Sequence, residues 1–290
     1  MATARDAKGE LLAFDWLGAC RRAAQGLREV LVEHPTSTER VVETGERGGG
    51  GDRTLVIDAE AEDAVFGELD RLHADGARFT AVSEERGYVD FGDPGVLVVI
   101  DPIDGSMNAK RGLTHHALSI AVADGPTMAD VVFGYVYDLG PGEEWRATRG
   151  LGAFLNDEPL ANPQPERRKR DGRLELVAIE SADPRWLAAS SDALVRVTGR
   201  LRAIGSIAVS MCQVAATRVD GMATLWKARA VDAAAAQLVV RESGGYVAFT
   251  AMDDPLGAPL DLEPHSPCVA ARTERSLAEL SRIPPAEGSL

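Results

Sequence analysis

Residues 98–108 read Val98-Val99-Ile100-Asp101-Pro102-Ile103-Asp104-Gly105-Ser106-Met107-Asn108. The apolar run over 96–100 predicts a buried strand, and Pro102, which has no N–H group to donate, predicts that this strand ends at Asp101. Asp101 and Asp104 then flank a tight turn, with the carbonyl of Ile103 between them. Two carboxylates and a carbonyl are the oxygen ligands that Mg²⁺ prefers. The segment therefore predicts a strand that leads directly into a magnesium site.

The residues after this turn favour an anion beside the metal. Gly105 lets the backbone approach a ligand closely, and Ser106 is suited to cap a following helical turn. The free N–H groups at the start of such a turn attract anions such as phosphate. Asp, Gly and Ser are also ordinary residues of surface turns, so this segment alone leaves a plain turn open as an alternative.

The composition is typical of an acidic, globular protein. The chain has 290 residues, 45% of them hydrophobic, which is enough for a large core in one or two domains. A formal net charge of −14 disfavours nonspecific binding to nucleic acid or membranes, because such binding needs basic surface. No apolar run approaches the roughly 20 residues that span a bilayer, and the charged N-terminus does not resemble a signal peptide. The three cysteines show no disulfide or metal spacing, which predicts reduced thiols in a cytoplasmic protein.

The first half of the chain predicts helices followed by a meander of strands. Residues 11–33 and 57–72 carry apolar residues at helical spacing. Between them, residues 36–52 are polar and include four consecutive glycines, which predicts either a plain linker or a mobile lid. Strands are expected at 77–82, 96–100, 116–123, 131–137, 144–148 and 153–155.

A segment rich in proline and basic residues, at 161–173, predicts a boundary between two parts of the chain. Its run over 167–170 is interpreted as a solvated linker rather than a nucleic-acid patch, because the protein is acidic overall. After it, predicted strands and helices alternate, which is typical of an α/β layer. We therefore expect an N-terminal α+β subdomain over residues 1–165 and a C-terminal α/β subdomain over residues 174–290.

Three motifs occur in order along the chain. They are Ser83-Glu84-Glu85, the segment from Asp101 to Asn108, and Val231-Asp232-Ala233-Ala234 followed by Glu242-Ser243-Gly244-Gly245. Together they resemble the G/S-E-E, D-P-[IL]-D-G-[ST]-x-N and (W/T)-D-x-A-A…E-x-G-G motifs of the inositol monophosphatase family. The resemblance implies a layered αβαβα sandwich with the active site between its halves. It also implies a Mg²⁺-dependent, lithium-sensitive phosphatase that acts on a small phosphorylated substrate and forms a homodimer.

The resemblance further implies that five residues hold two or three Mg²⁺ ions: Glu84, Asp101, Ile103 through its carbonyl, Asp104 and Asp232. Asp101 would bridge two ions, and Glu85 would interact with the metal ligands rather than with the metal itself. Carboxylates about 4 Å apart repel each other by roughly 4 kcal/mol at an effective dielectric of 20, so such a group calls for a cation. The alternative for Asp232 is a helix N-cap, a common role for Asp.

The same resemblance assigns roles toward the substrate. Gly105 and Ser106 would offer N–H groups to the phosphate. Asp58 and the Ser106 hydroxyl would orient and deprotonate the attacking water. The alternative for Asp58 is an acidic residue that stabilises a helix start.

Three further residues are expected to contact the rest of the substrate: Gly205, Ser206 and Leu225. Leu225 stands where animal inositol monophosphatases carry a Glu that contacts the inositol ring, and Val231 stands where many members have Trp. This region is more similar to the archaeal and broad-specificity members, some of which also accept fructose 1,6-bisphosphate. Inositol 1-phosphate is the leading substrate. Fructose-1,6-bisphosphatase, histidinol-phosphatase and 3′-phosphoadenosine 5′-phosphate phosphatase activities stay open, as does a binding protein without catalytic metal.

Overall fold

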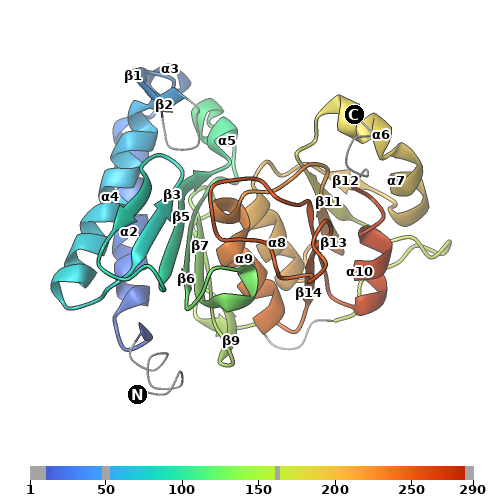
Figure 1. The fold of residues 1–290 in the computed structure, drawn as a ribbon. Coiled ribbons are helices and arrows are strands. Elements are labelled where there is room, and N and C mark those ends of the chain that lie inside the picture. Colours follow the sequence, from blue (N-terminus) through green and yellow to red (C-terminus); the bar gives the residue numbers. More distant parts are fainter. Residues whose placement is uncertain (1–10, 48–52, 161–163, 285–290) are drawn as a thin grey trace.

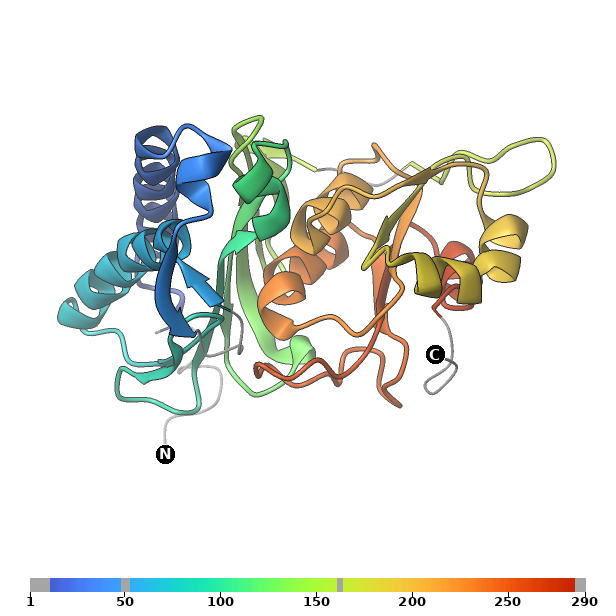
Figure 2. The same ribbon diagram turned by 90° about the horizontal axis from the view of Figure 1, so that it is seen from above.

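The structure is a computed structural model that describes residues 11–47, 53–160 and 164–284. Its helices and sheets form alternating layers, which two perpendicular views show (Figure 1, Figure 2). Helices cover the outer face of a first sheet, a second pair of helices lies between this sheet and another, and further helices cover the far side of the second sheet. The αβαβα sandwich expected from the sequence is therefore confirmed.

The outer layer beside the first sheet consists of α2 (Trp16–Glu33) and α4 (Val56–Ala74), which pack against each other. The helix predicted from residue 11 begins only at Trp16, because the Asp15 side chain accepts a hydrogen bond from the Gly18 N–H and caps the helix there. The first turn of α4 carries Asp58.

Eight strands of the described chain form the first sheet, in the order β10-β9-β8-β7-β6-β5-β3-β4. Neighbouring strands are antiparallel except β3 and β5, which are parallel. Because parallel strands end at the same edge of a sheet, the residues that follow β3 and β5 lie close together. The strands are β3 (Thr80–Ser83), β4 (Gly87–Asp90), β5 (Leu97–Asp104), β6 (Ala117–Ala123), β7 (Val131–Asp138), β8 (Glu143–Thr148), β9 (Gly152–Leu155) and β10 (Glu158–Pro159).

The prediction that β5 ends at Asp101 is wrong, since the strand continues through Pro102 to Asp104. Asp101 pairs with Ser119 and Asp104 with Ala117, and the register shifts between these two pairs. The irregularity accommodates the proline, which cannot donate to a regular ladder. Both carboxylates therefore project from the end of a paired strand.

The middle layer consists of α8 (Ile207–Ala215) and α9 (Ala230–Glu242). α9 contacts β5, β6 and β7 on one side and α8 on the other, so nearly all its residues are buried. Its backbone approaches the first sheet closely at Gly134, where an added Cβ would lie 2.6 Å from the carbonyl oxygen of Ala235. The small residues of α9 thus bring the start of this helix to the edge where β3 and β5 end.

Five described strands form the second sheet, in the order β12-β11-β13-β15-β14, with three short helices outside it (Figure 1). β11 is parallel to β12 and β13, while β15 is antiparallel to its neighbours. These elements are β11 (Val177–Glu180), α6 (Pro184–Ala189), α7 (Ser191–Val197), β12 (Leu201–Arg202), β13 (Gly221–Thr224), β14 (Tyr246–Phe249), β15 (Cys268–Ala271) and α10 (Glu274–Leu280).

Two arginines of the basic run over 167–170 contact the second half of the molecule. Arg168 lies 2.8 Å from a carboxylate oxygen of Glu279 and donates a hydrogen bond to Ser276. Arg167 donates to the backbone carbonyl of Thr217. Arg167, Lys169 and Arg170 are exposed, in line with a solvated segment, whereas Arg168 is only 20% exposed beside its partners on the C-terminal half.

Residues 36–52 were expected to lack packed structure, yet most of them form regular elements. They include α3 (Ser37–Arg40) and β1 (Glu43–Arg47), which pairs antiparallel with β2 (Arg53–Leu55). Arg40 donates to the carbonyl of Ala109, which fixes the segment against α5 (Ser106–Arg111). The four-glycine run at 48–51 lies outside the described residues, and a lid role for this segment stays a prediction.

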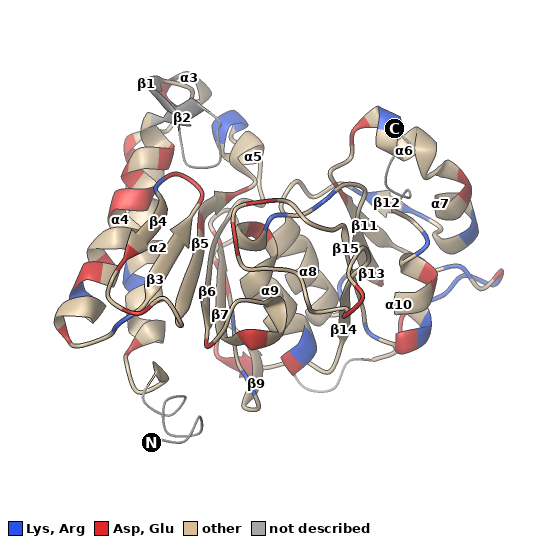
Figure 3. Ribbon diagram, viewed as in Figure 1, with Lys and Arg blue, Asp and Glu red and all other residues tan. Residues whose placement is uncertain are grey.

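Charge is unevenly distributed over the molecule. Figure 3 shows acidic residues along α4, on the side of the first sheet, basic residues at β12, and residues of both signs on α10. Of the helices that the structure describes, none combines the length and the apolar character that crossing a bilayer requires.

Candidate active site

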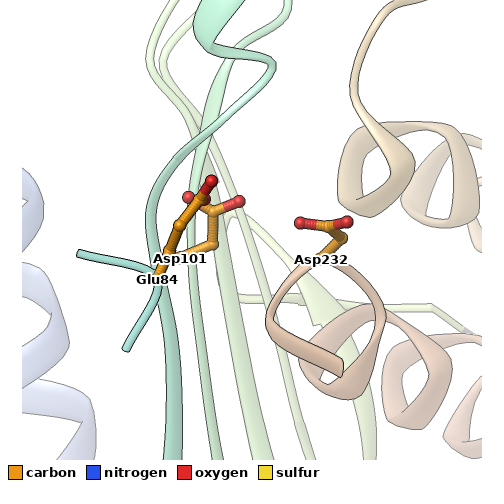
Figure 4. A group of neighbouring side chains, drawn as sticks. All are labelled: Glu84, Asp101 and Asp232. Atoms are coloured by element: carbon orange, nitrogen blue, oxygen red, sulfur yellow. The ribbon is translucent and has the colours of Figure 1, made fainter. Parts of the chain in front are cut away.

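Three carboxylates meet where the first sheet and the middle helices join. Glu84 follows β3, Asp101 lies on β5, and Asp232 lies in the first turn of α9 (Figure 4). One oxygen atom of each lies within 4.8 Å of the others. Two elements of the sheet and one helix thus bring together residues that are up to 148 positions apart, from Glu84 to Asp232.

Asp101 is almost fully buried at the centre of this group. Its Oδ1 accepts a hydrogen bond of 2.9 Å from the N–H of Ile103, whereas its Oδ2 is buried without a hydrogen-bond partner among the described residues. Burial raises the pKa of Asp101 well above its ordinary value, and the nearby charges of Glu84 and Asp232 raise it further. A buried, unpartnered oxygen beside two more carboxylates has the chemistry of a hard-cation site.

Arg229, which the sequence motifs did not identify, is the positive partner of this group. Its guanidinium contacts a carboxylate oxygen of Glu84, and its Nη2 lies 2.9 Å from Asp232 Oδ1. Burial opposes the charge on Arg229, but the carboxylates of Asp232, Glu84 and Asp101 outweigh burial and raise its pKa. Its position three residues before Asp232 is the signal that could have indicated it, since residues at that spacing lie on one side of a helix.

Asp104 lies outside the group of three and bonds instead to the start of α8. Its Oδ2 accepts hydrogen bonds from Ser206 Oγ at 2.6 Å and from the N–H of Ala208 at 2.7 Å. Burial raises the pKa of Asp104 to about 8, and the Asp232 charge adds to this, while the bonds from Ser206 and Ala208 act in the opposite direction. The structure therefore brings together three of the four predicted carboxylate ligands and places the fourth beside them as a link between the two halves.

A small cleft opens beside the carboxylates. Asp58, Glu85 and Ser106, all predicted for the site, contribute to its wall, as does Ile103. Lys110 also lines it and was not predicted. The lining residues are Asp58, Glu84, Glu85, Asp101, Pro102, Ile103, Ser106 and Lys110.

The turn between β5 and α5 differs in one detail from the prediction. Gly105, not Ser106, is the N-cap of α5, and Ser106 is the first helical residue. Gly105 has a φ of 90°, in the left-handed region, and an added Cβ would lie 2.8 Å from the carbonyl oxygen of Gly205. Only glycine fits there without displacing the neighbouring backbone. The phosphate-binding role proposed for this turn therefore depends on the close packing of the two backbone segments.

Asn108, the last residue of the same motif, joins the two halves of the molecule. Its Nδ2 donates hydrogen bonds to the carbonyls of Thr114, His115 and Ile204, the last at 2.8 Å. From the other half, Glu180 accepts hydrogen bonds from the N–H groups of Ile204 and Gly205, 3.0 Å each. The segment before α8 is therefore held from both sides.

The N-cap alternative for Asp232 does not apply, because Arg229 occupies that position and Asp232 lies in the first turn of the helix. The Leu225 side chain is fully buried in an apolar cluster with Val177, Ile179 and other residues of the second sheet. It therefore does not face the cleft, and its predicted contact with substrate is wrong for this structure.

The fold and the acidic cleft define a class, a layered αβαβα sandwich with a cluster of carboxylates between its layers. The chain belongs to the inositol monophosphatase family, whose sequence model matches residues 15–284. This is a family of phosphoric monoester hydrolases, so the resemblance noted from the three motifs is confirmed.

Relatives with different names match most of the chain. A fructose-1,6-bisphosphatase/inositol-1-monophosphatase from Methanothermobacter thermautotrophicus is 31% identical over 80% of this chain and 83% of its own length. The Nus factor SuhB of Escherichia coli is 33% identical over 75% of this chain and 79% of its own length.

Solved structures share the fold. The extragenic suppressor protein suhB from Bartonella henselae superimposes with a TM-score of 0.73 at 24% identity, covering 94% of this chain and 98% of its own. The inositol monophosphatase from Anabaena gives a TM-score of 0.70 at 23% identity, covering 93% and 97%. At these identities the likeness concerns the arrangement of the chain alone.

Proposed function

We propose that the protein hydrolyses small phosphate monoesters with Mg²⁺ as cofactor, and that inositol 1-phosphate is its leading substrate. The observation that carries the proposal is the meeting of Glu84, Asp101 and Asp232 beside a cleft that Asp58, Ser106 and Lys110 also line. Phosphate monoesters are anionic and hydrolyse slowly, so a catalyst must neutralise their oxygens and activate water.

The residues present fit a magnesium ion. Their donors are oxygens, they are largely buried, and Asp101 Oδ2 has no hydrogen-bond partner among the described residues. Glu84, Asp101, Asp232 and the carbonyl of Ile103 would hold such ions, with Asp104 close by. When bound, Mg²⁺ supplies charge neutralisation for the phosphoryl oxygens and lowers the pKa of water.

The chain's own residues would complete the reaction. Ser106 and Asp58 line the cleft and can orient a water molecule and accept its proton. The free N–H groups at the start of α5, together with the Lys110 ammonium, suit a phosphate group. Glu85 lines the same cleft and would support the ligands.

The substrate range is inferred to be broad. Because Leu225 is buried, it offers the substrate neither a hydrogen bond nor an apolar contact. Discrimination among analogues depends mainly on buried polar groups that pair with substrate hydroxyls. A relative 31% identical is named for both fructose-1,6-bisphosphatase and inositol-1-monophosphatase activities, which supports the same pair here.

Family membership supports a proposal for the quaternary and cellular properties. We infer a homodimer, a cytoplasmic location and inhibition by lithium. Light scattering on the purified protein would test the dimer, and a lithium titration of the phosphatase activity would test the inhibition.

The direct test of the proposed function is phosphate release from a panel of substrates. Inositol 1-phosphate, fructose 1,6-bisphosphate, histidinol phosphate and 3′-phosphoadenosine 5′-phosphate would each be assayed with Mg²⁺ and with a chelator. We expect turnover only with Mg²⁺, and kcat/KM values for the first two within about two orders of magnitude, as apolar discrimination allows. No Mg²⁺-dependent release from any of them would contradict the proposal.

A further inference from the structure

Arg229 contacts two of the three clustered carboxylates at the same time. Its Nη1 bonds to Glu84 Oε1, its Nη2 lies 2.9 Å from Asp232 Oδ1, and its Nε donates to Asp232 Oδ2 at 3.3 Å. Both oxygens of Asp232 and one of Glu84 therefore face a guanidinium. Glu84 and Asp232 are also two of the three residues whose carboxylate oxygens gather closely enough to hold a divalent ion.

We propose that Arg229 is a tethered cation that competes with divalent metal for Glu84 and Asp232, and that it leaves the carboxylates when metal binds. The proposal rests on the proposed metal-dependent function of this cleft. It assigns to Arg229 the control of metal affinity rather than a part in the chemical step.

The sharing of Glu84 and Asp232 favours an exchange of this kind. Three carboxylates that are mostly buried repel one another, and one guanidinium in their midst compensates part of that repulsion. Arg cannot give up its proton in a protein, so it stays positive when a divalent ion arrives. Two cations that share the same oxygens repel strongly in a buried site, and the monovalent one is displaced.

The position of Arg229 makes the exchange sterically feasible. It is the N-cap of α9, with an extended backbone outside the helix, so its side chain can turn without disturbing helical hydrogen bonds. Its side chain is 31% exposed, whereas that of Asp232 is only 9% exposed. The guanidinium thus has a route to solvent, while the carboxylate stays in place.

Competition has a measurable consequence for affinity. A metal that binds only when Arg229 has left must meet the cost of breaking its ion pairs, so the apparent dissociation constant exceeds the intrinsic one. A hydrogen bond to a charged group typically changes an equilibrium constant by about tenfold or more. Removing the guanidinium should therefore tighten metal binding and destabilise the metal-free protein.

The test measures Mn²⁺ binding by electron paramagnetic resonance, with no substrate present. Arg229→Met should bind Mn²⁺ at least about tenfold more tightly than the wild type, and Arg229→Lys, which keeps a charge without the planar fork, should lie between them. Arg218→Met removes an arginine that pairs with Glu143 instead, and should leave the affinity unchanged. Equal or weaker binding by Arg229→Met would overturn the proposal.

A second measurement does not depend on the folding of Arg229→Met. The wild-type protein would be labelled with ¹⁵N-arginine and studied by NMR, and the side-chain resonance of Arg229 would be assigned by its loss in Arg229→Lys. As Mg²⁺ is added, the chemical shift of this resonance should change from that of an ion-paired guanidinium to that of a solvent-exposed one. A resonance that stays ion-paired at saturating Mg²⁺ would also overturn the proposal. If the wild type binds no divalent ion at all, the proposed function fails instead, so the two failures are distinguishable.

Discussion

At the scale of single residues, the sequence motifs identified most side chains of the cleft, but not the residue that pairs with its carboxylates. The structure brings Glu84, Asp101 and Asp232 together and places Asp58 and Ser106 beside them. Arg229 was missed because no motif contains it and its partner Glu84 is 145 residues away along the chain. A sequence pattern shows which residues recur, but an ion pair across such a separation is visible only after folding.

Ser106 is the first residue at which the chemistry can be tested. Ser106→Ala should lower kcat by about 10²–10⁴, the range for one component of acid–base catalysis, with a smaller change in KM. The backbone N–H groups of α5 would still be available to the phosphate, which is why KM should change less. Steady-state kinetics would measure both, with Met107→Ala, an exposed neighbour on the same helix, as the control. A defect confined to KM would show that Ser106 binds rather than activates.

Glu180 provides a pH-dependent test of the segment that supports the site. Burial raises the pKa of Glu180 to about 7 from an ordinary 4.5, although Ser210, Ile204 and Gly205 donate hydrogen bonds to it. The folded state therefore retains a proton that the unfolded state releases between these two pH values. The stability that this proton contributes is complete below pH 4.5 and is lost as the pH rises through about 7.

Urea unfolding at a series of pH values would measure this loss. The free energy of unfolding of the wild type, minus that of Glu180→Gln, should fall between pH 4.5 and 7 with a slope of up to about 1.4 kcal/mol per pH unit. Gln does not titrate, so the variant removes this contribution and keeps the others. A difference that is constant over this range would contradict the assignment.

At the scale of elements, periodicity predicted most helices and strands, and local chemistry set their true ends. The strand expected to stop before Pro102 continues to Asp104, because a register shift accommodates the proline. Leu225 was assigned to the cleft from its spacing to Asp232, but the chain between them turns so that Leu225 enters the core. The spacing of residues in a motif shows where a residue lies along the chain. Outside helices and strands, it does not predict the direction in which the side chain points.

Gly105 tests the packing of the turn between β5 and α5. Gly105→Ala should destabilise the protein by more than Gly112→Ala, although both glycines have a positive φ. An added Cβ at Gly105 would meet the backbone oxygen of Gly205 at 2.8 Å, whereas at Gly112 it would have no described atom within 4 Å. We expect a cost of about 1–2 kcal/mol at Gly112, from backbone conformation alone, and a further loss at Gly105. Equal free energies of unfolding would contradict the close approach.

At the scale of the whole molecule, the site exists only because the two sheets share the middle helices. One apolar cluster combines Val82 and Val99 of the first sheet with Val209 and Met211 of α8. Asp104 bonds to Ser206 across the same junction. The layered architecture could be predicted from the family motifs, whereas this joint core could not, because it depends on side chains that meet only in the folded chain. The division into residues 1–165 and 174–290 stays a prediction.

The central claim is that the carboxylates around Asp101 bind the metal on which phosphate-ester hydrolysis depends. Asp101→Asn keeps the size of the side chain and the acceptor for the Ile103 N–H, but removes the charge at the centre of the group. The most direct test titrates Mg²⁺ into the wild type and this variant while inositol 1-phosphate hydrolysis and thermal unfolding are followed. We predict a folded variant whose kcat falls by at least about 10³, as expected when charge stabilisation at the reacting phosphate is lost. Turnover near that of the wild type at saturating Mg²⁺, with normal thermal stability, would contradict the account.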